Sequence, residues 1–211
     1  MQKSYGNLEG ALAIMANGAL ILQFPLAHSF LLSQRGQKIL SLLGPKDLAI
    51  SLSTTSFTIV ASIQLFALFM LWSPSKIVFE LPFEFLIYIL PILYCLSWFL
   101  LIVATIDAGL EVQSGALGWI SVLARKKPKF PELPTTGLYR IIRHPIYASF
   151  FLAVLTVPTW TADQIVVSLI LGGYCIFAPI LKDRRLIERH GEKYLRYKNT
   201  TPYMLPSKII K

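Results

Sequence analysis

The residues best suited to chemistry lie together at positions 138–147. Arg143 and His144 come directly before Pro145, and proline is favoured at the first position of a helix, where its missing N–H is no loss. The unpaired N–H groups and positive dipole end of such a helix attract anions. Tyr147 follows His144 by three residues, so both face the same side of the first turn. We therefore predict a site that holds a carboxylate with Arg or His beside an aromatic face.

The same cluster has a plainer interpretation as a membrane anchor. Basic and aromatic residues flank many membrane helices at the water boundary, where they fix the orientation of the helix. The cations would then be anchors and the tyrosines part of an interfacial aromatic belt. The residues concerned are Tyr139, Arg140, Arg143, His144 and Tyr147. Composition alone leaves both interpretations open.

A second candidate group is the run of charges at residues 182–185. Asp183 could meet Arg143 or the ammonium group of a ligand, because a helical hairpin would return this end of the chain to the membrane face of His144. Alternatively, the run is a solvated cap whose cations suit the negative end of a helix dipole.

Two polar positions inside apolar segments form a third group. His28 lies eleven residues after Asn17, so the two side chains project from nearly the same face of a helix. Polar residues in membrane helices usually face the bundle interior and mark function or packing, and here both interpretations stand. Asp107, at the end of another apolar segment, needs a partner for the same reason.

The composition defines the setting of these residues. Hydrophobic residues make up 55% of the chain and charged residues 15%, with a net charge of +9. A soluble domain rarely combines so much apolar residue with so little charge. The basic residues lie between apolar segments of membrane length, so membrane orientation explains them better than nucleic-acid binding. The two cysteines lie within apolar segments and the three histidines stand far apart, so we expect no metal site.

Five apolar segments approach the roughly 20 residues that a membrane-spanning helix needs. They are residues 8–33, 48–73, 83–107, 145–160 and 162–181. The fourth is the shortest, and the polar turn at 158–163 joins it to the fifth as a helical hairpin.

The distribution of positive charge supports five spans. Lys and Arg number three, one, six, none and nine in the successive loops and the C-terminal tail. This alternation follows the positive-inside rule and places the N-terminus outside and the C-terminus in the cytoplasm.

Two further stretches complete the predicted fold. Residues 109–136 indicate an interfacial stretch followed by an extended, proline-rich path. The tail at 182–198 is predicted as an amphipathic helix, with Gly191 as a point of bending. We therefore predict an all-α integral membrane protein with five transmembrane helices plus a cytoplasmic amphipathic C-terminal helix. It would be a single domain, 1–211, with a three-helix part (1–107), an interfacial connection (108–136) and a part that contains the hairpin and the C-terminal helix (137–206).

Three motifs in the second half resemble one family. They are Tyr139-Arg-Ile-Ile-Arg-His-Pro-Ile-Tyr147, Leu186-Ile-x-x-His-Gly-Glu-x-Tyr-x-x-Tyr197 and Pro202-Tyr-Met-Leu-Pro206. In this order, with a hairpin between the first two, they resemble the membrane methyltransferases related to isoprenylcysteine carboxyl methyltransferase, a superfamily that includes phospholipid methyltransferases.

Within that superfamily, the first half points to one branch. Leu22-Gln-Phe-Pro-Leu-Ala-His-Ser29 and Leu71-Trp-Ser-Pro74, with the turn Val157-Pro-Thr-Trp-Thr161, resemble the methanethiol S-methyltransferase and NnrU-like branch. The resemblance implies an enzyme that transfers a methyl group from S-adenosylmethionine, leaving S-adenosylhomocysteine. It also implies an integral protein of the bacterial inner membrane with its active site facing the cytoplasm.

The resemblance assigns roles to individual residues. The implied cofactor-binding residues are Tyr139, Arg143, His144, Pro145, Tyr147, Asp183, Tyr194 and Tyr197. Arg143, Asp183 and His28 are the candidate catalytic residues, with His28 as acceptor of a thiol proton. Where the family usually has two consecutive acids, this chain has Lys182 and then Asp183.

The partners implied are a lipid bilayer and a small apolar or membrane-partitioned methyl acceptor, with no metal and no nucleic acid. The most direct prediction is S-methylation of a small thiol such as methanethiol. The alternatives are methylation of a prenylated or lipid-borne carboxylate or amine, and a non-catalytic membrane protein that retains the fold.

Overall fold

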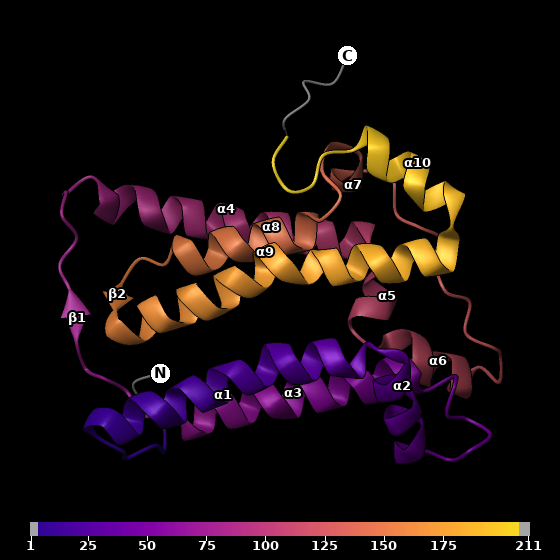
Figure 1. The fold of residues 1–211 in the computed structure, drawn as a ribbon, viewed down its shortest axis with the longest axis horizontal. Helices are drawn as coiled ribbons and strands as arrows, with labels where there is room; N and C mark the ends of the chain where they lie inside the picture. Colours follow the sequence, from indigo (N-terminus) through magenta and orange to yellow (C-terminus); the bar gives the residue numbers. More distant parts are fainter. Residues whose placement is uncertain (1–3, 207–211) are drawn as a thin grey trace. The chain divides into compact units, whose positions relative to one another are not determined.

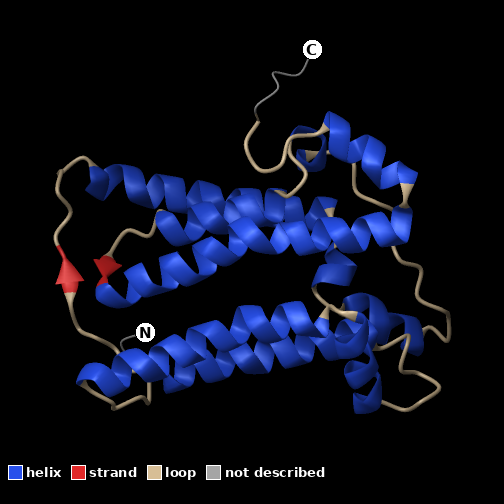
Figure 2. Ribbon diagram, in the orientation of Figure 1, coloured by secondary structure: helices blue, strands red, loops and turns tan. Residues whose placement is uncertain are grey.

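The computed structural model describes residues 4–206 as a mostly helical chain with one small sheet (Figures 1 and 2). The elements in chain order are α1 (Gly10–Leu31), α2 (Gln34–Leu40), η1 (Ser41–Leu43), α3 (Ser53–Leu71), β1 (Val78–Phe79), α4 (Leu86–Asp107), α5 (Leu110–Gln113), α6 (Ala116–Leu123), α7 (Leu138–Ile141), α8 (Pro145–Leu155), β2 (Trp160–Thr161), α9 (Ala162–His190) and α10 (Glu192–Thr200). They divide into two compact units, formed by the described parts of residues 1–76 with 109–130 and of residues 77–108 with 131–211.

In the first unit, α1 packs along α3, and a buried polar pair fastens the end of α3 to α1. The Asn17 amide donates to the Ser73 carbonyl at 2.6 Å and accepts the Ser73 N–H at 2.9 Å. Helix α6 lies against α3 through Thr55, whose hydroxyl donates to the Gly115 carbonyl at 2.6 Å and accepts the Trp119 N–H at 3.1 Å. Side-chain to backbone bonds thus hold this unit where apolar packing alone would allow sliding.

In the second unit, α8 lies between α4 and α9, and the segments lie side by side in Figure 1. Small buried residues allow the close approach: Ala104, Ser149 and Ala153. The α8–α9 hairpin predicted from the turn at 158–163 is confirmed. Its loop contains β2, which pairs antiparallel with β1. The sequence did not indicate this sheet, because two-residue strands carry no alternating pattern.

Within residues 4–206, four helices are long and apolar enough to cross a membrane: α1, α3, α4 and α9. They coincide with four of the five predicted spans, and much of their apolar surface faces outward. This arrangement suits a lipid environment and indicates an integral membrane protein. Helix α8 has 11 residues, so the count of five spans and their orientation stay predictions.

The C-terminal tail differs from the prediction in one respect. Helix α9 does not end near residue 181 but continues to His190. It stops at Gly191, whose φ of +52° favours a residue without a side chain. The remainder of the predicted tail helix is α10, so Gly191 is a break between two helices. As a result, Lys182 and Asp183 sit inside a continuous helix that fixes the direction of both side chains.

Candidate functional site

The segment that carries the first motif is held by a carboxylate at its start. Asp107, at the end of α4, accepts the N–H of Leu138, the first residue of α7, at 2.8 Å. Gly137 precedes it with a φ of +58°, and a side chain there would collide with the Asp107 carboxylate. Asp107 thus has the partner that the sequence required, and its role is to position α7.

Arg143 and His144 lie between α7 and α8, and the chain's own C-terminal segment fixes their backbone. The Arg143 N–H donates to the Pro202 carbonyl at 2.8 Å, and the His144 N–H to the Tyr203 carbonyl at 3.3 Å. Arg140 points to solvent. Of the two arginines in the motif, only Arg143 therefore enters the cluster.

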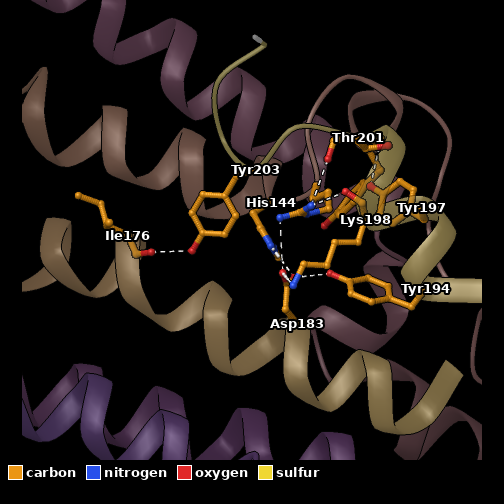
Figure 3. A network of polar contacts seen from close by, with 10 residues as sticks. His144, Ile176, Asp183, Tyr194, Tyr197, Lys198, Thr201 and Tyr203 are labelled. Atoms are coloured by element: carbon orange, nitrogen blue, oxygen red, sulfur yellow. Dashed lines mark hydrogen bonds and ion pairs between the residues drawn. The ribbon is translucent and has the colours of Figure 1, made fainter. Parts of the chain in front are cut away.

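Asp183 of α9 is the centre at which the separate motifs meet (Figure 3). Its carboxylate lies 3.5 Å from the Arg143 guanidinium, 3.3 Å from the Lys198 ammonium and 2.9 Å from Nε2 of His144. It also accepts a hydrogen bond from the Tyr194 hydroxyl. Its side chain is only 6% exposed. The meeting of Asp183 with Arg143 predicted from the sequence is thus observed.

Both terminal nitrogens of the Arg143 guanidinium contact other groups of the protein. One terminal nitrogen donates to the Lys198 carbonyl at 2.6 Å and the Thr201 carbonyl at 3.3 Å, while the other faces Asp183. Those carbonyls lie at the C-terminal end of α10, where a cation complements unpaired acceptors and the helix dipole. Arg143 therefore clamps α10 to α9, which is a positioning task beside any contact with a ligand.

Three tyrosines close the cluster from the tail. Tyr197 donates to the backbone carbonyl of Tyr139 at 2.6 Å, and Tyr203 donates to the Ile176 carbonyl at 2.7 Å. Burial raises the pKa of Tyr197, and burial together with the hydrogen bond to Asp183 raises the pKa of Tyr194. These hydroxyls stay protonated and act as hydrogen-bond donors.

His144 is buried in a way that favours its neutral form. Its side chain has no exposed surface, and its ring lies 5.0 Å from that of Tyr203 and 6.2 Å from that of Tyr147. Burial lowers the pKa of His144, although the Asp183 carboxylate opposes that shift. The predicted placement of His144 and Tyr147 on one side is confirmed.

Several buried polar atoms of this cluster lack a hydrogen-bond partner. They are Nε of Arg143, Nδ1 of His144 and the hydroxyl of Tyr139. Nε2 of His144 lies 2.9 Å from the Asp183 carboxylate. Buried polar groups are normally paired, so unpaired donors and acceptors gathered around a carboxylate indicate a candidate ligand site. Two cations against one carboxylate also leave positive charge, which suits the carboxylate of a cofactor.

His28 belongs to the first unit, in α1. Its ring lies 5.4 Å from that of Phe24 and 4.8 Å from that of Phe57. Asn17, on the same helix, is occupied by its two bonds to Ser73 and has a packing role. The assignment of His28 as a proton acceptor stays a prediction.

Sequence reasoning missed the contributions of Lys198 and Tyr203. A signal for Lys198 was present, since it follows Tyr194 by four residues and thus shares its helix face. Tyr203 lies in the third motif, and the Arg143 guanidinium stands 5.6 Å from the centre of its ring. Among residues 4–206, the His, Cys, Asp and Glu side chains form no group of three that could hold a metal.

Comparison with known proteins gives relatives of a single kind. No family model and no solved structure matches the chain. It is similar to the methanethiol S-methyltransferase of Pseudomonas deceptionensis, with 27% identity over 93% of this chain and 74% of the relative. It is also similar to methanethiol S-methyltransferase 1 of Bradyrhizobium diazoefficiens (26%, over 92% and 67%) and to the methanethiol S-methyltransferase of Crocosphaera subtropica (25%, over 92% and 75%).

These relatives confirm the resemblance that the motifs predicted, over nearly the whole chain. Because they are named as methyltransferases, they support a methyltransferase activity. The membrane setting follows separately from the apolar helices.

Proposed function

We propose that this protein is an S-adenosylmethionine-dependent methyltransferase of the bacterial cytoplasmic membrane that methylates a small thiol such as methanethiol. The observation that carries the proposal is the convergence of residues 139–147 and 183–203 on the Asp183 carboxylate. Relatives named for thiol methylation, similar over nearly the whole chain, support the choice of acceptor.

The cluster has the donor set that the cofactor needs. Bound S-adenosylmethionine supplies an electrophilic methyl group on a positively charged sulfur, and the protein supplies binding and orientation. The unpaired Nε of Arg143 and a ring nitrogen of His144 suit its carboxylate, and the hydroxyl of Tyr139 is a further donor. Tyr147 contributes an aromatic face, while Pro145, Tyr194 and Tyr197 shape and support the site.

The acceptor must react as a thiolate, because the thiol itself is a poor nucleophile. The positive charge of Arg143 favours the thiolate, and we assign the acceptance of its proton to His28. A small apolar thiol partitions into the bilayer, so the apolar helices provide its route. The positive-inside pattern supports a cytoplasmic location for Asp183 and its neighbours, where the cofactor is found.

The test is transfer of a labelled methyl group from S-adenosylmethionine to methanethiol by the purified protein in lipid, with dimethyl sulfide measured by gas chromatography. We expect turnover by the wild type and a loss of at least about hundredfold in Arg143→Ala, because both its charge and its hold on α10 are removed. The matched control is Lys193→Met, which removes an exposed cation that pairs with Glu132.

Two other outcomes would redirect the proposal. If label enters a lipid extract and no thiol, the acceptor is lipid-borne and S-methylation is wrong. If no acceptor is labelled and neither S-adenosylmethionine nor S-adenosylhomocysteine binds, the chain is a membrane protein that retains the fold without the activity.

A further inference from the structure

Lys182 places a positive charge on two aromatic rings of the site. Its ammonium nitrogen lies 5.7 Å from the centre of the Tyr147 ring and 6.0 Å from that of the Tyr139 ring. These distances fall within the range in which the negative face of an aromatic ring attracts a cation. The tyrosine pair is therefore a place for a cation, and a side chain of the protein fills it.

Apart from the two tyrosine rings, the ammonium group of Lys182 has few stabilising contacts. Across residues 4–206, no ion pair or side-chain hydrogen bond involves its ammonium group. The neighbouring carboxylate of Asp183 is occupied by Arg143 and Lys198. A four-carbon stem with rotatable bonds can carry the ammonium group away without moving the helix.

The two rings are positioned by contacts that do not depend on Lys182. The backbone of Tyr139 is held by the Tyr197 hydroxyl, and the Tyr147 ring stands 6.3 Å from that of Tyr174 and 6.2 Å from that of His144. Removal of the lysine charge should therefore leave the aromatic pair in place for another cation.

A methyl-donating cofactor would bring such a cation. S-adenosylmethionine carries a sulfonium, and aromatic faces recognise methylated cationic groups. S-adenosylhomocysteine has a neutral thioether at the same point. The two ligands are alike elsewhere, so their relative affinity reports the charge that the protein presents there.

Resting on the function proposed above, we propose that Lys182 is a tethered cation that occupies the aromatic subsite of the sulfonium group. Cofactor binding then requires its ammonium group to leave the Tyr139–Tyr147 pair. Lys182 thereby sets the charge selectivity of the site, disfavouring S-adenosylmethionine relative to S-adenosylhomocysteine.

The experiment is calorimetric titration of both ligands into the full-length protein in detergent, for the wild type and Lys182→Met. Methionine keeps most of the length of the side chain without its charge. We expect about tenfold tighter S-adenosylmethionine binding in the variant, since the positive charge that competes with the sulfonium is removed. Binding of S-adenosylhomocysteine should change by less than about twofold. Lys193→Met, which removes an exposed lysine, should change neither affinity.

Two further variants keep the test decisive. Lys182→Gln replaces the methionine variant if the latter does not fold, and Lys182→Arg, which retains the charge, should keep the wild-type ratio of affinities. An unchanged ratio in the uncharged variants, or weaker S-adenosylmethionine binding, would overturn the role of Lys182 and leave the proposed function intact. Absence of binding of either ligand to any form would overturn both.

Discussion

Two buried polar clusters in this protein are built in opposite ways. In the first unit, Asn17 and Ser73 satisfy one another, with the side-chain amide bonded to both the N–H and the carbonyl of Ser73. In the second unit, Asp183 gathers two cations, an imidazole and a phenol, yet polar atoms around it remain unpaired.

The contrast separates a stabilising network from a candidate binding site. A closed pair gains its full hydrogen-bond energy from the fold and offers nothing to a ligand. An open cluster gives up part of that energy, because each unpaired buried group carries a desolvation penalty. Mutations in the two clusters should therefore change different measured quantities.

The largest effect is expected at Asp183. In Asp183→Asn, Arg143 and Lys198 lose their counter-charge, so the donors that face the ligand lose their orientation. S-adenosylhomocysteine should bind about a hundredfold more weakly in calorimetric titration. Glu132→Gln, which removes an exposed acid paired with Lys193, is the control. An unaltered affinity in Asp183→Asn would mean that the Asp183 cluster, like the Asn17–Ser73 pair, takes no part in ligand binding.

The next largest effect is expected for substitution of Asn17, which should change the stability of the protein and leave ligand affinity unaltered. Asn17→Leu leaves the N–H and carbonyl of Ser73 buried without partners, which should lower the free energy of unfolding by about 2 kcal/mol. Thermal unfolding in detergent measures this change. Because Asn17 serves packing, the affinity of the folded variant for S-adenosylhomocysteine should stay within about twofold of wild type. Weakened binding at unchanged stability would contradict the division between the clusters.

The smallest effect concerns pH and His144. Burial lowers the pKa of His144 in the folded state, so the unfolded chain binds the proton more readily. The contribution of neutral His144 to stability is fully present above the unfolded pKa of about 6.5. It is lost as pH falls through the lower folded value, by up to about 1.4 kcal/mol per pH unit.

Unfolding measured from pH 8 to pH 5 checks this prediction against His144→Gln, which should lack that part of the pH dependence. Identical profiles for the two proteins would show that His144 is not held neutral.

Much of the site could be predicted because its motifs are local. Pro145 marks the start of α8 through its fixed φ, and the three-residue spacing of His144 and Tyr147 places both on one side. Asp183 was predicted as a partner of Arg143 because a hairpin returns the chain to its starting level. The spacing of Lys198 and Tyr194 was visible in the sequence. The contact of Lys198 with Asp183 and the bond from Arg143 to the Thr201 carbonyl could not be predicted, since they depend on where α10 turns after Gly191.

The sequence by itself determined the apolar segments, their helical form and the residue types that could bind an anion, because hydrophobicity and helix-terminus chemistry act over a few residues. Only the tertiary structure decided that α4 packs on α8, that α9 runs unbroken past Lys182, and that this lysine rests on two tyrosine rings. Those outcomes depend on side-chain packing between segments distant in the chain, for which no local spacing carries a signal.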